Sequence, residues 1–107
     1  KGITTAFVCE SQINTLYFRS LFPGYYSIGL FGTGSKTQLE TLKKSGIRNY
    51  ILLFDGDEGG HKGASRFIKA LGKDTWITQV QIPDGKDIND LSKEEILFLL
   101  NKEGIYL

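Results

Sequence analysis

Four short apolar runs alternate with segments of helical periodicity along this chain, and the alternation constrains the fold more than any other feature. The runs are the expected strands, at residues 4–9, 25–31, 49–54 and 75–82. After each run, apolar residues recur every three or four positions, as they do on one face of a helix. Strands that alternate with helices form parallel sheets through right-handed crossovers. The sequence therefore predicts an α/β, Rossmann-like fold, a parallel four-stranded sheet with helices on both faces.

Helix boundaries are also marked in the sequence. The apolar stripe expected on the first helix consists of Ile13, Leu16, Tyr17 and Leu21. Ser35 and Ser92 are placed to cap the second and fourth helices, the latter in a capping box with Glu95. Gly46 and Gly72 are placed to end the second and third helices.

Length and composition limit the class of protein. A chain of 107 residues is long enough for one hydrophobic core, so we expect a single domain over residues 1–107. It starts at Lys1 and contains no methionine, which indicates a piece of a longer protein. No apolar run approaches the ~20 residues of a membrane span, and no signal peptide is present. The single cysteine, Cys9, excludes an internal disulfide and favours the reducing cytoplasm.

Carboxylates follow the third expected strand in the stretch ILLFDGDEGG, residues 51–60. Three acids at the end of a buried strand repel one another unless a cation neutralises them. Glu10 follows the first strand, and Asp87 lies in the loop after the fourth. Loops that follow parallel strands share one edge of the sheet. Because all the candidate ligands are oxygens, Asp55, Asp57, Glu10 and Asp87 point to Mg²⁺ or Mn²⁺.

A purely structural interpretation of Asp55-Gly56-Asp57 is also available. Aspartate caps helices through its side chain, and glycine allows tight turns. Asp-x-Asp alone is therefore compatible with a turn before a helix. The additional carboxylate at the end of another strand, and the Gly59-Gly60 pair that permits close backbone approach, favour the metal site.

Basic residues form two local groups although the net charge is only +1. One group lies along the third expected helix, opposite its apolar face, and consists of Lys62, Arg66, Lys69 and Lys73. The other group surrounds the second expected helix and consists of Lys36, Lys43, Lys44 and Arg48. Such groups are most often solvated helix faces. Lys36 and Lys62 are expected nearest the acidic edge, so they are the candidates for phosphate contacts.

The segment Gly32-Thr33-Gly34-Ser35-Lys36 is close to a phosphate-binding P-loop but departs from it. That motif needs a lysine directly after its last glycine, whereas Ser35 intervenes here. A tight turn followed by an N-cap explains the segment. The N–H groups of Gly32, Thr33 and Gly34 remain candidates for holding a phosphate.

Glu10 at a strand end, FDGDEGG and PDGKDIND together resemble the Toprim domain shared by DnaG-type primases, topoisomerases and related nucleases. The primase branch is the most similar, because LFGTGSKTQLETL resembles the primase Leu-Gly-Thr segment and PDGKD resembles the primase Pro-Asp-Gly-x-Asp loop. The resemblance implies the catalytic core of a DnaG-like DNA primase, a nucleotidyltransferase of DNA replication. The implied partners are a single-stranded DNA template, nucleoside triphosphates, the other domains of the parent protein and a helicase.

The resemblance also assigns roles to particular residues. It implies that Glu10 is the acid/base or metal-binding glutamate, that Asp55 and Asp57 are metal ligands, and that Asp87 is the downstream acid. Two departures from the family pattern reduce the negative charge. The chain has Ser11 and Asn14 where primases usually have glycine and aspartate, and Asn89 where they often have a second aspartate. Fewer charges weaken a second metal site.

Three other interpretations compete with primer synthesis. The first is phosphodiester chemistry of the nuclease or topoisomerase type on the same fold. The second is a non-catalytic Toprim module that binds nucleic acid or metal. The third, a haloacid-dehalogenase-like phosphatase, requires Asp-x-Asp on the first strand, whereas two strands precede it here, and too little chain remains for the rest of that site.

Overall fold

The structure is a computed structural model that describes residues 4–30 and 35–107. It contains the predicted alternation of strands and helices. In chain order the elements are β1 (Thr5–Cys9), α1 (Gln12–Leu21), β2 (Ser27–Gly29), α2 (Lys36–Lys43), β3 (Asn49–Leu52), α3 (Glu58–Leu71), β4 (Trp76–Gln79), the 3₁₀ turn η1 (Ile88–Asp90) and α4 (Lys93–Lys102).

The strands form one parallel sheet in the order β2-β1-β3-β4. The chain starts in the middle of the sheet, moves to one edge with β2, and then crosses β1 to reach β3. The strand order thus reverses between β1 and β3, and a doubly wound sheet binds its ligands at the carboxyl ends of strands where this happens. β1 and β3 are paired neighbours in the sheet.

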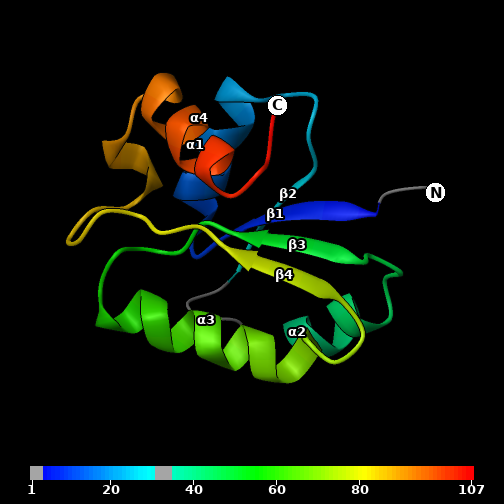
Figure 1. The fold of residues 1–107 in the computed structure, drawn as a ribbon. Helices are drawn as coiled ribbons and strands as arrows, with labels where there is room; N and C mark the ends of the chain where they lie inside the picture. The colour runs from blue at the N-terminus through cyan, green and yellow to red at the C-terminus, as the bar shows by residue number, and fades with distance from the viewer. Residues whose placement is uncertain (1–3, 31–34) are drawn as a thin grey trace.

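Helices cover both faces of the sheet (Figure 1), with α1 and α4 on one face and α2 and α3 on the other. Each face has its own hydrophobic core. Phe7, Phe18 and Leu53 are buried under α1 and α4, whereas Tyr50 and Phe67 are buried under α2 and α3. The alternating side chains of β1 and β3 contribute to both cores, as expected for strands covered on both sides.

Three of the four predicted helix ends are confirmed, whereas α2 is capped by Lys44, and Gly46 lies two residues beyond the cap with a φ of 85°. The Ser35 hydroxyl accepts the N–H of Gln38 at the start of α2. Ser92 and Glu95 form the capping box at the start of α4. Gly72 is the C-cap of α3. Local backbone chemistry therefore sets these boundaries as the sequence indicates.

The predicted buried face of α1 is confirmed for Tyr17 and Leu21, which pack against the core, and wrong for Ile13 and Leu16. Ile13 and Leu16 are 71% and 60% exposed, whereas Asn14, Thr15 and Phe18 are buried. Thr15 is satisfied inside the protein because its hydroxyl donates to the Ser11 carbonyl. The helix thus carries two sets of residues at helical spacing. The set that contains Asn14 and Thr15 can face inward because these polar side chains form hydrogen bonds inside the protein.

The edge strands are shorter than predicted. β2 ends at Gly29, and position 31 of the expected strand lies outside the described residues. β4 ends at Gln79, although the Val80 N–H still donates to the Leu52 carbonyl at 3.0 Å, and Val80 and Ile82 remain buried. The loop after β4 also contains η1. Among the described helices, none is long and apolar enough to cross a membrane.

Candidate functional site

Glu10 and Asp55 meet at the carboxyl edge of the sheet, between β1 and β3. The Glu10 Oε1 atom accepts the backbone N–H of Asp55 at 2.8 Å. Two residues earlier, the N–H of Leu53 donates to the Val8 carbonyl at 2.8 Å. The Glu10 side chain thus continues the β1–β3 hydrogen-bond ladder beyond the end of the strands. This bond fixes Glu10 beside Asp55, as the sequence predicts.

Asp55 is the most unusual group of this edge. Its Oδ1 atom is buried and has no hydrogen-bond partner among the described residues. Burial, followed by the negative charges of Glu10, Asp87 and Asp57, raises the pKa of Asp55 to about 7. A buried acceptor without a donor costs free energy unless a cation or a proton satisfies it. Asp55 is therefore suited to bind a cation.

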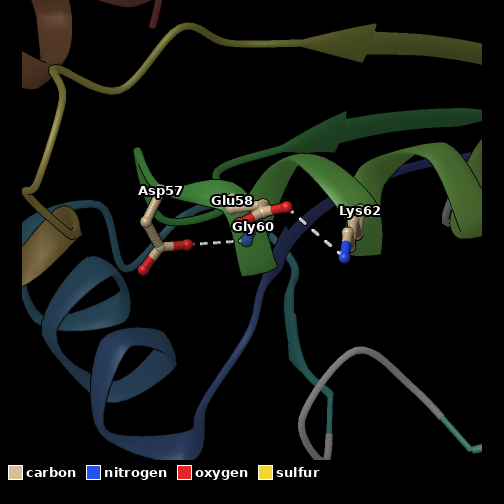
Figure 2. Close-up of polar contacts among 4 residues, drawn as sticks. All are labelled: Asp57, Glu58, Gly60 and Lys62. Atoms are coloured by element: carbon tan, nitrogen blue, oxygen red, sulfur yellow. Dashed lines mark hydrogen bonds and ion pairs between the residues drawn. The ribbon is translucent and has the colours of Figure 1, made fainter.

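Asp57 has the structural role that the sequence left open. It is the N-cap of α3, and its Oδ1 atom accepts the Gly60 N–H at 2.7 Å (Figure 2). The other carboxylate oxygen is not used in the cap and points away from the helix in the same view. Asp57 can therefore cap α3 and still offer one oxygen to a ligand.

Asp87 is the N-cap of η1, which lies in the loop after β4. Its Oδ1 atom accepts the Asn89 N–H at 2.9 Å, and Asp90 Oδ2 accepts the Asp87 N–H at 3.0 Å. This capping box fixes the backbone around Asp87. The charge of Asp87 contributes to the raised pKa of Asp55, so the two carboxylates are within electrostatic range of each other.

Backbone hydrogen bonds link the two acidic loops directly. The Gly56 N–H donates to the Lys86 carbonyl at 2.8 Å, and the Gly85 N–H donates to the Gly56 carbonyl at 2.7 Å. A Cβ atom on Gly56 would lie 2.2 Å from the Pro83 carbonyl oxygen, so only glycine allows this approach. This contact could not be predicted from the sequence, because no local pattern pairs position 56 with a loop 30 residues later.

A second contact that the sequence does not predict joins the two asparagines that depart from the family pattern. Asn89 Nδ2 donates to Asn14 Oδ1 at 2.7 Å, and Asn14 is only 4% exposed. The bond fastens η1 to the first turn of α1. The sequence shows two separate departures from the family pattern, and only the fold shows that the two neutral side chains are partners.

The predicted phosphate contacts have different outcomes. Gly32, Thr33 and Gly34 lie outside the described residues. Lys36 is exposed at the first position of α2. Lys62 lines a groove that begins at Gly56 and Asp57, and its ammonium group lies 3.4 Å from Glu58 (Figure 2). Its position near the acidic edge is therefore as expected, although it pairs with an acid of its own helix.

The carboxylates are neighbours without forming a complete cage for a cation. Among residues 4–30 and 35–107, no three acidic, histidine or cysteine side chains converge closely enough to hold a metal ion. The caps on Asp57 and Asp87 each use one oxygen. What the structure provides is the buried Asp55 acceptor with three further carboxylates in electrostatic range.

Comparison of the chain with protein families identifies the fold. The sequence profile of the Toprim-like family matches residues 7–92. The chain belongs to the Toprim-like family. The match includes β1 to η1, and with them Glu10, Asp55, Asp57 and Asp87. A search among curated protein sequences finds no significant match.

This Toprim-like domain is similar in fold to parts of solved primases. The chain is similar to the Aquifex aeolicus primase zinc-binding and RNA polymerase domains, with a TM-score of 0.75 and 25% identity, over 92% of this chain and 26% of that one. It also matches the primase fragment of the bacteriophage T7 primase-helicase protein, with a TM-score of 0.71 and 21% identity, over 96% of this chain and 41% of that one.

A further T7 structure shows the same fold. It contains the lagging-strand DNA polymerase interacting with primase domains bound to an RNA/DNA hybrid and dTTP, and its matching chain has a TM-score of 0.73 and 24% identity. The match covers 92% of this Toprim-like domain and 54% of that chain. The domain thus spans between about a quarter and about half of the solved chains it matches.

Proposed function

We propose that this Toprim-like domain is the metal-dependent nucleotidyl-transfer core of a DnaG-like DNA primase, which makes primers for DNA replication. The observation that carries the proposal is the buried, unpartnered Asp55 Oδ1 atom at the carboxyl edge, on a fold that matches a primase polymerase domain. The proposed partners are a single-stranded DNA template, nucleoside triphosphates, further domains of the parent protein and a helicase.

Mg²⁺ or Mn²⁺ is the proposed cofactor, and Asp55 is the central ligand. Asp57 and Asp87 would each offer the carboxylate oxygen that does not cap a helix. When bound, the cation neutralises charge on phosphate oxygens and lowers the pKa of an attacking hydroxyl. Oxygen-only ligands favour these two ions over zinc.

Glu10 is the proposed catalytic residue. Its Oε1 atom is held by the Asp55 N–H, so the carboxylate has a fixed position, and its second oxygen is the one proposed to act. That oxygen would accept the proton of the attacking hydroxyl or contact the cation. Either role requires a carboxylate at this position, because a neutral amide can do neither well.

Metal affinity is expected to depend on pH through Asp55. Its pKa of about 7 means that a proton and a cation compete for the carboxylate near neutral pH. The apparent affinity for Mn²⁺ should rise about tenfold per pH unit below pH 7 and become constant above it. Calorimetry in buffers of different ionisation enthalpy measures the proton release. Affinity that is flat across this pH range would contradict the assignment.

The Asn14–Asn89 pair supports a single metal site. We expect the unmodified domain to bind one Mn²⁺ ion, because an amide pair without charge occupies the place between α1 and η1. The variant with both Asn14→Asp and Asn89→Asp has two carboxylates facing each other there, and they repel unless a cation lies between them. We expect it to bind a second Mn²⁺ ion. Native mass spectrometry gives the stoichiometry, and one ion in both proteins would contradict this account.

Primer synthesis by the full-length parent protein tests the proposed function. With single-stranded template, nucleoside triphosphates and Mg²⁺, Glu10→Gln and Asp55→Asn should each abolish primer formation, whereas Glu103→Gln, at the exposed end of α4, should leave it intact. Primer synthesis that survives both site variants would overturn the proposal. Cleavage of DNA without added nucleotides would instead support the nuclease or topoisomerase alternative.

One observation favours a second candidate, a non-catalytic Toprim module. No three candidate ligands converge within the described part of the chain, and two positions that are acidic in related primases are neutral. Such a module would bind nucleic acid or metal while another protein supplies the chemistry. Full-length protein that binds template and Mn²⁺ but forms neither primer nor cleavage product would select it.

A further inference from the structure

A basic surface with an exposed tryptophan lies at the amino ends of the strands, on the side of the sheet opposite the acidic site. Two neighbouring grooves share Lys73, Asp74 and Thr75. Their lining contains four basic side chains and one acidic one: Lys43, Arg48, Lys69 and Lys73, with Asp74. The local charge is strongly positive although the whole chain carries only +1. We call these grooves and Trp76 the amino-edge surface.

Trp76 is the most informative residue of this surface. It is 79% exposed, and it is the single tryptophan of the chain. A large aromatic ring of this kind is normally covered, and tryptophan is enriched where proteins bind partners. The exposed ring lies in the same groove as Arg48 and Lys73.

The backbone below the ring is firmly held. The Trp76 N–H donates to the Arg48 carbonyl at 2.8 Å, which joins the start of β4 to β3. The Thr75 hydroxyl donates to the Leu71 carbonyl at the end of α3 at 2.7 Å. Trp76 is therefore presented from a fixed position. In Figure 1 this edge, where α3 returns to β4, lies at the opposite end of the sheet from the loop between β3 and α3.

We propose that the amino-edge surface binds single-stranded nucleic acid, with a base stacked on Trp76 and the phosphates along the basic grooves. Unpaired bases stack on aromatic rings in a sequence-tolerant way, and basic grooves follow the backbone. Duplexes keep their bases stacked internally and cannot use the ring in this way. The surface is distinct from the acidic edge, so it can hold a strand without the metal.

The experiment uses the fluorescence of Trp76 itself. Oligothymidylate and oligouridylate are titrated into the domain in EDTA, and we expect saturable quenching as bases stack on the indole. The affinity should fall with salt, with a slope reduced by roughly 1.4 when Lys69→Gln and Lys73→Gln are combined, since each phosphate contact on a single strand contributes about 0.7. Lys93→Gln with Lys102→Gln, on α4, is the matched control and should keep the slope.

A labelled oligonucleotide tests the ring in a variant without tryptophan. By anisotropy, Trp76→Ala should weaken binding by about tenfold or more, while Trp76→Phe should retain most of the affinity. Asp55→Asn should bind the oligonucleotide as the unmodified domain does, so failure at the acidic edge and failure here are distinguishable. Absence of quenching by both oligonucleotides, quenching lost equally in the α4 control, or equal binding of a duplex would each overturn the proposal.

Discussion

Gly60→Ala is expected to destabilise the domain by about 3 kcal/mol, the largest effect of any single substitution considered. A Cβ atom at position 60 would lie 2.0 Å from the Asp55 carbonyl oxygen and 2.8 Å from its carbonyl carbon. Both contacts are with backbone, so no side-chain rotation relieves them. The start of α3 must move away from Asp55, which also disturbs the acidic site. Chemical denaturation with a far-UV signal measures the loss.

Gly59→Ala is the matched control for this prediction. A Cβ atom there would lie 3.5 Å from Asp57 Oδ1, which is an ordinary contact. Because alanine favours helix over glycine, this variant should gain up to about 1 kcal/mol. Equal stability changes in the two variants would show that the approach of α3 to Asp55 is not as the structure has it.

Asp55→Asn is expected to abolish Mn²⁺ binding while making the metal-free domain more stable. The pKa of Asp55 is raised from 3.8 to about 7, so the ionised carboxyl is disfavoured in the folded state. The unfolded carboxyl ionises first, and the stability of the unmodified domain therefore falls as pH rises from about 4 to about 7. After allowance for solvent screening, we expect the variant to gain about 1–2 kcal/mol above pH 7.

Thermal unfolding in EDTA across this pH range checks the stability change. A gain of 1 kcal/mol corresponds to roughly 4–8 °C in a domain of this size. The unmodified domain and Asp55→Asn should have the same Tm near pH 4 and separate progressively toward pH 7. The exposed Asp74→Asn serves as the control and should follow the unmodified domain. A variant that is less stable than the unmodified domain above pH 7 would show that the Asp55 carboxylate is satisfied without metal.

Much of the fold could be predicted because its signals are local. The strands and helices follow from periodicity, and Ser35 and Ser92 mark helix starts through bonds to backbone three residues away. The meeting of Glu10 with Asp55 also follows, because loops after adjacent parallel strands share an edge. The acids at the end of a buried strand are themselves enough to indicate Asp55 as a candidate ligand.

Other features could not be predicted because they depend on contacts between distant segments. The Asn14–Asn89 bond joins residues 75 positions apart, and it explains why a polar residue of α1 faces inward. The two glycines after Asp57 look equivalent in the sequence, yet a Cβ atom is excluded only at Gly60. Asp57 caps α3, and the same carboxylate has a second oxygen outside the cap, so the cap alone does not decide between the two interpretations of Asp-Gly-Asp.

The most direct test of the account is a crystal of the domain soaked in Mn²⁺ at one pH unit above the pKa of Asp55, with anomalous difference density to locate the ion. The account predicts a single peak bonded to Asp55, with Glu10, Asp57 or Asp87 completing the protein ligands, and no peak in Asp55→Asn crystals. A peak elsewhere, or the same peak in the variant, would contradict the proposed metal site and the primase chemistry that depends on it.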